Sequence, residues 1–243
     1  MEEKIKLFRE QLADSQKIAF FGGAGVSTAS GIPDFRSATG LYMEDTHRKY
    51  SAEEIISNHF FVKHPKEFFE FYSEKLIYPE AEPNLAHDFL VNIEQEGKEV
   101  TVITQNIDGL HQTAGSTIVH ELHGTVLDNY CLECHRVYSL DDLKIDEEGI
   151  PRCPLDQGVV RPDIVLYGEN LKNETIESSI KAIEEADMLI VAGTSLIVYP
   201  AAGLINYFKG KYLVVVNKTR LHTYLPNALI FEAEMNEVFS QVR

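Results

Sequence analysis

The chain has 243 residues, and its 22 Lys plus Arg against 38 Asp plus Glu give a formal net charge of −16. With 44% hydrophobic and 25% charged residues, the composition excludes a mostly disordered chain and favours one large domain carrying a smaller one. The acidic charge argues against nucleic-acid phosphates and anionic membrane surfaces, so we expect neither a nucleic acid nor a membrane as a partner.

The predicted location is the cytoplasm. No run of about 18 apolar residues is present, and the amino terminus lacks the basic start and apolar stretch of a signal peptide. Three cysteines are too few for an internal disulfide framework. In a reducing compartment, clustered cysteines indicate a metal before a disulfide.

Short apolar strands alternate with helices along the chain. The predicted helices are 2–14, 52–60, 64–77, one that begins near Pro83, 174–186, 200–209 and one that closes the chain. The predicted strands are 17–21, 100–104, 164–167, 188–192, 212–216 and 228–231. This alternation is typical of βαβ units, and it predicts an α/β fold with a doubly wound parallel sheet covered by helices on both faces.

Two stretches interrupt the alternation. Residues 37–82 are predicted to be helical without strands, and 125–162 contain every cysteine. We expect both stretches to form a second, smaller lobe, while the sheet lobe consists of 1–36, 83–124 and 163–243. Ligands of such sheets bind beyond the carboxyl ends of the strands.

A glycine-rich turn follows the first predicted strand, in Phe20-Phe-Gly-Gly-Ala-Gly-Val-Ser-Thr-Ala-Ser-Gly31. Glycines let a backbone approach a pyrophosphate, and a helix that starts there adds N–H donors. The same turn without a ligand is a simple strand-to-helix connection, so the glycines alone leave both interpretations open.

Two details argue against an ordinary dehydrogenase. A G-x-G-x-x-G match from Gly23 and Gly25 places Thr28 where the third glycine belongs. The segment 32–37 then follows instead of a second strand that ends in an acid. A dinucleotide bound here needs another group for its ribose, and Asn217 after the strand 212–216 is one candidate, with a plain turn as the alternative.

Six blocks of sequence resemble the sirtuins, the NAD-dependent protein lysine deacylases. They are, in family order, 23–37 (GAGVSTASGIPDFRS), 104–108 (TQNID), 121–124 (ELHG), 131–134 (CLEC), 161–169 (RPDIVLYGE) and 193–196 (GTSL). The resemblance spans nearly the whole chain and is that of a compact bacterial or archaeal type. It implies a Rossmann-like lobe, a small lobe with a helical module and a zinc-ribbon-like module, and a cleft between them for NAD and the acylated lysine.

The resemblance also assigns the reaction chemistry. Nicotinamide leaves NAD, the acyl oxygen of the lysine amide attacks, and His123 acts as base on the ribose hydroxyls. Asn106 is expected to hold the ribose or a catalytic water, and Asp108 with Ile107 to receive the carboxamide of nicotinamide, which needs a carboxylate acceptor and a backbone donor. Nicotinamide is therefore expected as both a product and an inhibitor.

Further cofactor contacts are implied by the same blocks. Phe35 is expected to shield the nicotinamide side and Arg36 to contact phosphate or ribose. Either Ala233 or Glu234 is expected near the adenine. The remaining expected contacts are Ala24, Thr28, Asp34, Gln105, Gly193, Thr194, Ser195 and Asn217.

The acyl-lysine peptide is expected to bind as an added strand between the lobes. One flank is Val165, Leu166, Tyr167 and Gly168, and the other is Val198. Relatives that prefer acidic acyl groups carry a Tyr and an Arg three residues apart, whereas this chain has Tyr72 and Lys75. Because Lys cannot make the bidentate clamp of Arg, we expect acetyl to be preferred over succinyl, although Tyr72 also suits simple packing of an aromatic helix.

The metal site departs from the family. Two C-x-x-C pairs would make a Cys₄ zinc site, and Cys131, Cys134 and Cys153 are present, but Asp156 stands at the fourth position. Zinc accepts carboxylate oxygen, so a structural Cys₃Asp site is feasible. His135 is a second candidate for the fourth ligand, and a module that holds zinc weakly or not at all is the alternative.

The sequence leaves two other functions open. A mono-ADP-ribosyltransferase would use the same NAD site and His123, and a non-catalytic module would sense NAD without turnover. Against the sensing module, Asn106, Asp108 and His123 supply more polar groups than sensing requires.

Overall fold

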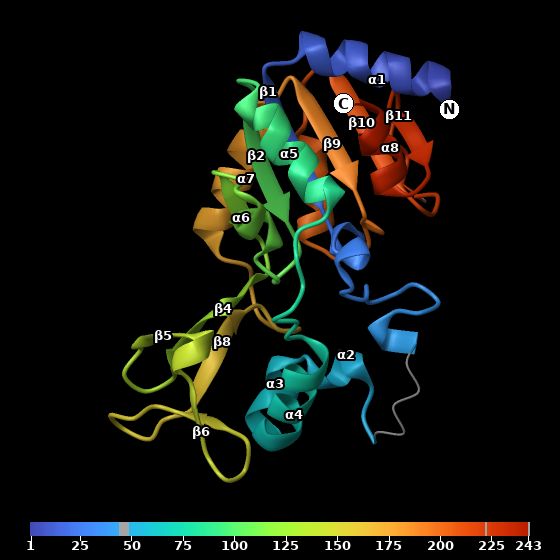
Figure 1. Cartoon of the computed structure of the whole chain (residues 1–243). Helices are drawn as coiled ribbons and strands as arrows, with labels where there is room; N and C mark the ends of the chain where they lie inside the picture. Colours follow the sequence, from blue (N-terminus) through green and yellow to red (C-terminus); the bar gives the residue numbers. More distant parts are fainter. Residues whose placement is uncertain (44–48, 222, 243) are drawn as a thin grey trace.

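A six-stranded parallel sheet forms the larger part of the molecule in this computed structural model, which describes residues 1–43, 49–221 and 223–242 (Figure 1). Residues 44–48 of the expected helical stretch therefore lie outside the described part. The order of the strands is β11-β10-β9-β1-β2-β3. Their bounds are β1 Lys17–Gly22, β2 Glu99–Thr104, β3 Val119–Glu121, β9 Met188–Ala192, β10 Tyr212–Asn217 and β11 Leu229–Glu232.

The sheet is doubly wound, as predicted. The chain moves outward from β1 to β2 and β3, then returns to the other side of β1 and continues from β9 to β10 and β11. Gly22 at the end of β1 pairs with Thr104 of β2 and Ala192 of β9. The direction of winding therefore reverses between β1 and β9, and a ligand crevice is expected at their carboxyl ends.

Helices cover both faces of the sheet. Phe20 and Phe21 are adjacent on β1, fully buried, and point into two different hydrophobic clusters. The helices α1 (Glu2–Asp14), α5 (Leu85–Gln95) and α8 (Met235–Val242) pack on the face of Phe20. The helix α7 (Asn173–Glu185) and the 3-10 helix η5 (Ala201–Tyr207) pack on the face of Phe21.

A helical module lies beyond one end of the sheet (Figure 1). Its helices are α2 (Ala52–Ile55), α3 (Asn58–Lys63) and α4 (Pro65–Lys75). The single helix predicted over 52–60 is wrong, because Ser57 caps a new helix by accepting a hydrogen bond from Phe60 N–H at 3.2 Å. Aromatic side chains from α3 and α4 make up much of its core: Phe60, Phe61, Phe68, Phe69, Phe71 and Tyr72.

The cysteine module is built from two small antiparallel sheets. The strands β4 (Gly124–Cys131), β5 (Val137–Ser139) and β8 (Val160–Ile164) make one sheet, and β6 (Lys144–Ile145) pairs with β7 (Pro151–Arg152) in the other. None of these strands except the last residue of β8 was predicted. The strands β5, β6 and β7 have only two or three residues, and β4 and β8 bury polar residues such as Asn129 and Arg161, so none shows a clear alternation of polar and apolar residues.

Several further elements differ from the sequence prediction. The strand predicted at 164–167 ends at Ile164, and η5 is a 3-10 helix where an α-helix was predicted. Helix α6 (Leu110–Ala114) and strand β3 were not predicted, because three to five residues carry too little periodicity. No helix among the described residues is both long enough and apolar enough to span a membrane.

Candidate functional site

The loops after β1 and β9 meet at the point where the winding reverses. The N–H of Gly23 donates to Ala192 O at 3.2 Å, and the N–H of Gly25 donates to Gly193 O at 2.9 Å. A Cβ atom placed on Gly25 would lie 2.8 Å from Gly193 Cα. These glycines are therefore required first by the contact between the two loops, whatever ligand the turn also holds.

The glycine turn does not open an α-helix, which corrects the sequence prediction. It forms two single 3-10 turns, η1 (Ala24–Val26) and η2 (Thr28–Ser30), and Gly31 then adopts a left-handed conformation with φ of 86°. Thr28 turns its hydroxyl back to Gly25 O at 3.0 Å. An anion at this turn would meet backbone N–H groups without the dipole of a full helix.

A polar network joins the β1 loop to the β2 loop. Ser27 donates its hydroxyl to Asp108 Oδ2 at 2.6 Å, and Asn106 Nδ2 donates to Ser27 Oγ at 2.9 Å. Asp108 Oδ1 also accepts the N–H of Leu110 at 3.0 Å, which anchors the start of α6. Asn106 and Ser27 are buried, so this network is held in place by the end of the sheet.

Gln105 connects three parts of the site. Its backbone N–H donates to Gly22 O at 3.0 Å, and its side-chain Nε2 donates to Thr194 Oγ1 at 3.1 Å. Its carbonyl oxygen lies 2.9 Å from His123 Nδ1. Because a carbonyl oxygen only accepts, Nδ1 of His123 carries the proton and Nε2 keeps its lone pair. Burial lowers the pKa of His123, so its ring is neutral at neutral pH.

The segment 34–37 forms a compact loop beside the β1 turn. Asp34 Oδ1 accepts the N–H groups of Arg36 and Ser37 at 2.9 and 2.7 Å. The ring of Phe35 packs against Tyr42, with centroids 5.5 Å apart. Asp34 therefore orders this loop through its carboxylate, and a contact with the cofactor remains a prediction.

The other expected cofactor residues lie along the same edge of the sheet. Gly193 and Thr194 follow β9, and Ser195 is exposed next to them. Asn217 ends β10, and its Nδ2 donates to Thr219 O at 2.7 Å, as a turn Asn does. The carbonyl of Asn217 accepts the N–H of Ala233, and Glu234 pairs with Lys218 at 2.7 Å.

The segment 165–168 crosses from the sheet lobe to the helical module. The N–H of Tyr167 donates to Ile56 O, and its carbonyl accepts the N–H of Asn58, each at 3.0 Å. The N–H of Val165 donates to His123 O at 2.9 Å. Among the described residues, the carbonyl of Val165 and the N–H of Gly168 have no backbone partner. These two groups are available to an added strand.

Arg161 and Glu169 support this segment and were not singled out from the sequence. Arg161 is 5% exposed, and its Nη1 donates to Glu169 Oε1 at 2.6 Å and its Nη2 to Ile164 O at 2.8 Å. Glu169 Oε2 accepts the N–H of Leu166 at 2.9 Å. Both residues belong to the family-like block 161–169. Their ion pair spans eight residues, a spacing that no local sequence pattern indicates.

Ser27 and Tyr42 are further site residues that the sequence analysis missed. Ser27 stands inside the quoted glycine block, so its place in the polar network was open to prediction. The hydroxyl of Tyr42 lies 2.9 Å from that of Tyr167, a contact across 125 residues. The remaining expected residues, Ile107 and Val198, are partly exposed at the same end of the fold.

Tyr72 is packed in the helical module. It is 4% exposed, and its ring stacks on Phe68 with centroids 5.9 Å apart and planes 10° apart. Its buried hydroxyl has no hydrogen-bond partner among the described residues, and burial raises the pKa of Tyr72 well above the ordinary value. The structure therefore shows the packing role, and a contact with an acyl group remains a prediction.

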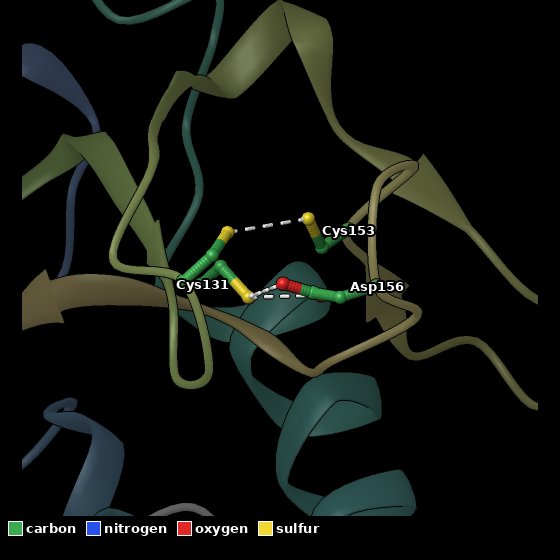
Figure 2. A group of neighbouring side chains, drawn as sticks. Cys131, Cys153 and Asp156 are labelled. Carbon is green, nitrogen blue, oxygen red and sulfur yellow. Dashed lines mark hydrogen bonds between the residues drawn. The ribbon is translucent and has the colours of Figure 1, made fainter.

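The four expected metal donors come together in the cysteine module. One donor atom from each of Cys131, Cys134, Cys153 and Asp156 lies within 4.8 Å of all the others. The Sγ atoms of Cys134 and Cys153 are 3.7 Å apart, and Cys131 Sγ is 3.4 Å from Asp156 Oδ1. Figure 2 shows the Asp156 carboxylate pointing at the sulfur of Cys131, with Cys153 beside them.

These separations fit a tetrahedral zinc site. With Zn–S near 2.3 Å and Zn–O near 2.0 Å, the edges of a tetrahedron are roughly 3.8 Å between sulfurs and roughly 3.5 Å from sulfur to oxygen. The Cys134 thiol and the N–H of Gly158 hold the pKa of Asp156 at about 2, so it is a carboxylate at neutral pH. The residues present therefore fit zinc with Asp156 as the fourth donor.

Neighbouring groups orient these donors. The N–H of Glu133 donates to Cys131 Sγ at 3.4 Å, and the hydroxyl of Tyr138 lies 3.1 Å from Cys153 Sγ. The N–H of Gly158 donates to Asp156 Oδ1 at 2.9 Å, and a Cβ there would come within 3.0 Å of Cys131 Sγ. Such second-sphere contacts are typical of metal sites.

Comparison with known proteins gives consistent matches over the whole chain. The model of the Sir2 family matches residues 23–200. An NAD-dependent protein deacetylase of Clostridium perfringens is 49% identical over 243 residues, which is 100% of this chain and 99% of that protein. An NAD-dependent protein deacetylase of Clostridium acetobutylicum is 52% identical over 217 residues, 89% of each chain.

Solved structures agree with this match. A Sir2 structure with deacetylated p53 peptide and 3'-O-acetyl ADP ribose superposes with a TM-score of 0.87 and 38% identity, covering 98% of this chain and 96% of that one. A Sir2–p53 peptide–NAD+ structure gives a TM-score of 0.85 at 38% identity and the same coverage.

Proposed function

This chain belongs to the Sir2 family, and we infer that it is an NAD-dependent protein deacetylase, which transfers the acyl group of acyl-lysine to ADP-ribose and releases nicotinamide. The observation that carries this inference is the polar network of Ser27, Asn106 and Asp108 beside His123 at the switch point of the sheet. Full-length relatives with that name support it.

We propose that the cleft separates two lobes. The NAD-binding lobe comprises 1–36, 83–124 and 163–243, and the small lobe comprises 37–82 and 125–162. The separate hydrophobic clusters of the sheet and of the helical module support this division. The hydrogen bonds of Tyr167 to Ile56 and Asn58 join the two lobes at the segment along which the peptide would lie.

His123 is the proposed catalytic base. Its Nδ1–H is held by Gln105 O, so the ring presents Nε2 as the acceptor of a proton from a ribose hydroxyl. Because burial lowers the pKa of this ring, the neutral form that a base requires persists to more acidic pH.

Asp108 is the proposed acceptor for the carboxamide of nicotinamide. Its carboxylate already accepts from Ser27 Oγ and from Leu110 N–H. A carboxylate offers about four lone-pair sites, so further acceptor capacity remains for an amide N–H. The two existing bonds then fix the direction in which that capacity faces, and Ile107 supplies the backbone partner of this pocket.

The acyl-lysine peptide is proposed to add alongside the segment 165–168, which follows β8. Val165 C=O and Gly168 N–H are its free backbone groups, and Val198 is the proposed opposite flank. Leu166 anchors the segment in the apolar core of the helical module, and apolar walls beside the free groups would suit the neutral stem of acetyl-lysine. The missing Arg at Lys75 supports acetyl over acidic acyl groups.

Zinc is proposed as a structural ion held by Cys131, Cys134, Cys153 and Asp156. When bound, it cross-links two loops of the cysteine module and supplies no group to the cleft. His135 is not among the clustered donors, so the geometry favours Asp156 as the fourth ligand.

One incubation tests the proposed function. The chain is mixed with NAD and an acetyl-lysine peptide, and the products are identified by mass spectrometry. We expect deacetylated peptide, acetyl-ADP-ribose and free nicotinamide in equal amounts. ADP-ribosylated protein without deacetylation would indicate the transferase, and bound but unchanged NAD would indicate a sensor; either result would contradict the proposal.

A further inference from the structure

Two tyrosine hydroxyls and one guanidinium form a chain of contacts between the loop 34–37, Tyr42 and the segment 165–168. Arg36 Nη2 donates to the hydroxyl of Tyr167 at 3.1 Å, and the hydroxyl of Tyr42 lies 2.9 Å from that of Tyr167. The guanidinium carbon of Arg36 also lies 5.2 Å from the centre of the Tyr42 ring. Tyr167 therefore contacts Arg36 of the loop 34–37 through its hydroxyl. The proposed deacetylation chemistry gives this hydroxyl no role.

Tyr167 is also held by its backbone, within the segment 165–168 that would bind the peptide. Its N–H and C=O are both bonded to the start of the helical module, at Ile56 and Asn58. Its neighbours on the same segment, Val165 and Gly168, carry the two free backbone groups. A peptide strand that binds these groups therefore orders the backbone on both sides of Tyr167.

Arg36 is the exposed member of this group of three side chains. It lies on the loop organised by Asp34, and only one of its five N–H groups is bonded to Tyr167. The other N–H groups remain for an oxyanion or hydroxyl ligand. Burial raises the pKa of Tyr42, so that hydroxyl keeps its proton and the cluster holds a single positive charge.

We propose that the hydroxyl of Tyr167 is a positioning group that transmits peptide binding to Arg36, so that an acyl-peptide bound along 165–168 tightens the binding of NAD. The peptide adds backbone contacts on both sides of Tyr167 to those that Tyr167 already makes, its hydroxyl then keeps Arg36 in one rotamer for more of the time, and the ordered guanidinium meets the phosphate or ribose with less loss of side-chain entropy. By linkage, NAD tightens the peptide by the same factor.

The test is a thermodynamic cycle. The Kd of NAD is measured by calorimetry without and with saturating acetyl-lysine peptide, using the catalytically slow background His123→Ala to prevent turnover. The Kd of NAD without peptide is divided by the Kd with peptide. This ratio is then measured again in the same His123→Ala background with Tyr167→Phe added. Removing one charge-assisted hydrogen bond should reduce the ratio by about 3- to 10-fold and leave the Kd of the peptide alone within about 2-fold.

Two further variants make the result specific. Tyr42→Phe keeps the bond between Arg36 and Tyr167, so its ratio should fall less than that of Tyr167→Phe. Tyr212→Phe is the matched control, because it removes a hydroxyl bonded to Asp14 at 2.7 Å at the opposite end of the sheet. Its ratio should equal that of the unmodified background.

Several outcomes would overturn the proposal. An unchanged ratio in Tyr167→Phe, no peptide effect on NAD in the background protein, or tighter NAD binding in Tyr167→Phe without peptide would each do so. The last result would show that the contact restrains Arg36 instead of positioning it. The proposal rests on the deacetylase function, whose own failure would appear separately, as an absence of acetyl-ADP-ribose in the wild-type incubation.

Discussion

The proposed NAD site rests on strands whose side chains are buried on both faces, whereas the cysteine module has only a small hydrophobic cluster of its own among the described residues. Strand β9 is buried along its whole length, and the network of Ser27, Asn106 and Asp108 lies beyond the ends of β1 and β2. The module's own cluster consists of Cys131, Cys153 and Val160, while its Val126 and Ile150 pack into the core of the helical module, and it exposes Val137 by 66% and Leu155 by 63%.

This difference teaches that the two regions are stabilised by different forces. The cleft inherits its geometry from a packed core, so a polar group there can be removed without loss of the fold. The module buries too little apolar surface to hold its own loops, so the ligands of a metal must supply its stability. Substitutions in the first region should change chemistry, and those in the second should change folding.

The largest effect is expected from His123→Ala. Loss of general-base catalysis should lower kcat for deacetylation by about 10²–10⁴-fold. The melting temperature should stay within about 2 °C, because His123 is only partly buried and its ring makes one hydrogen bond, to Gln105 O. Steady-state kinetics and calorimetric NAD binding check this, with His120→Ala as the matched control. An Ala variant that keeps more than about a tenth of wild-type kcat would remove His123 from the role of base.

Removal of the metal should have the opposite pattern. A strong chelator, or Cys153→Ala, should lower the melting temperature by about 5–10 °C. Hydrogen exchange should accelerate across 129–160 and remain slow in β1 and β9, because only the module depends on the ion. Equal acceleration in the sheet would show that the two regions are one cooperative unit and would contradict the comparison.

Asp156→Cys should strengthen the module. A fourth thiolate binds zinc more tightly than a carboxylate oxygen, so the variant should retain zinc at about 10-fold higher chelator concentration and melt a few degrees higher. Asp156→Ala should show the reverse, and Asp142→Ala is a control for the loss of one negative charge in the same module. If the wild type retains all of its zinc and Asp156→Cys retains no more, the Asp156 carboxylate binds zinc as tightly as a thiolate would, which contradicts this prediction.

The smallest expected effect is a displaced pH profile. The base must be neutral, and burial lowers the pKa of His123 below the ordinary value near ~6.5. The acid limb of kcat/KM should therefore lie below pH ~6.5, with activity lost only as the pH falls through the lowered pKa. Initial rates between pH 5 and 8 check this, and an acid limb above ~6.5 would mean that a neighbouring carboxylate outweighs burial.

The main features of the fold follow from patterns that a single strand or helix carries. Residues 188–192 are apolar throughout, which is the composition of a strand buried on both faces, and β9 has those bounds. The fold class and the clustering of the three cysteines with Asp156 were predicted and are confirmed. The strand predicted at 164–167 was wrong, because apolar residues there cross to the helical module instead of continuing β8.

The sequence by itself determined which chemical groups are present and their order: the glycine turn, the amide and carboxylate after β2, His123, and three cysteines with Asp156 and His135 as candidates for the fourth metal donor. Only the tertiary structure decided which of them meet. Ser27 and Asp108 are 81 residues apart and share a hydrogen bond, and Tyr42 and Tyr167 are 125 apart. Such contacts depend on how the parallel strands order themselves and on how the lobes close, and no local propensity encodes that arrangement.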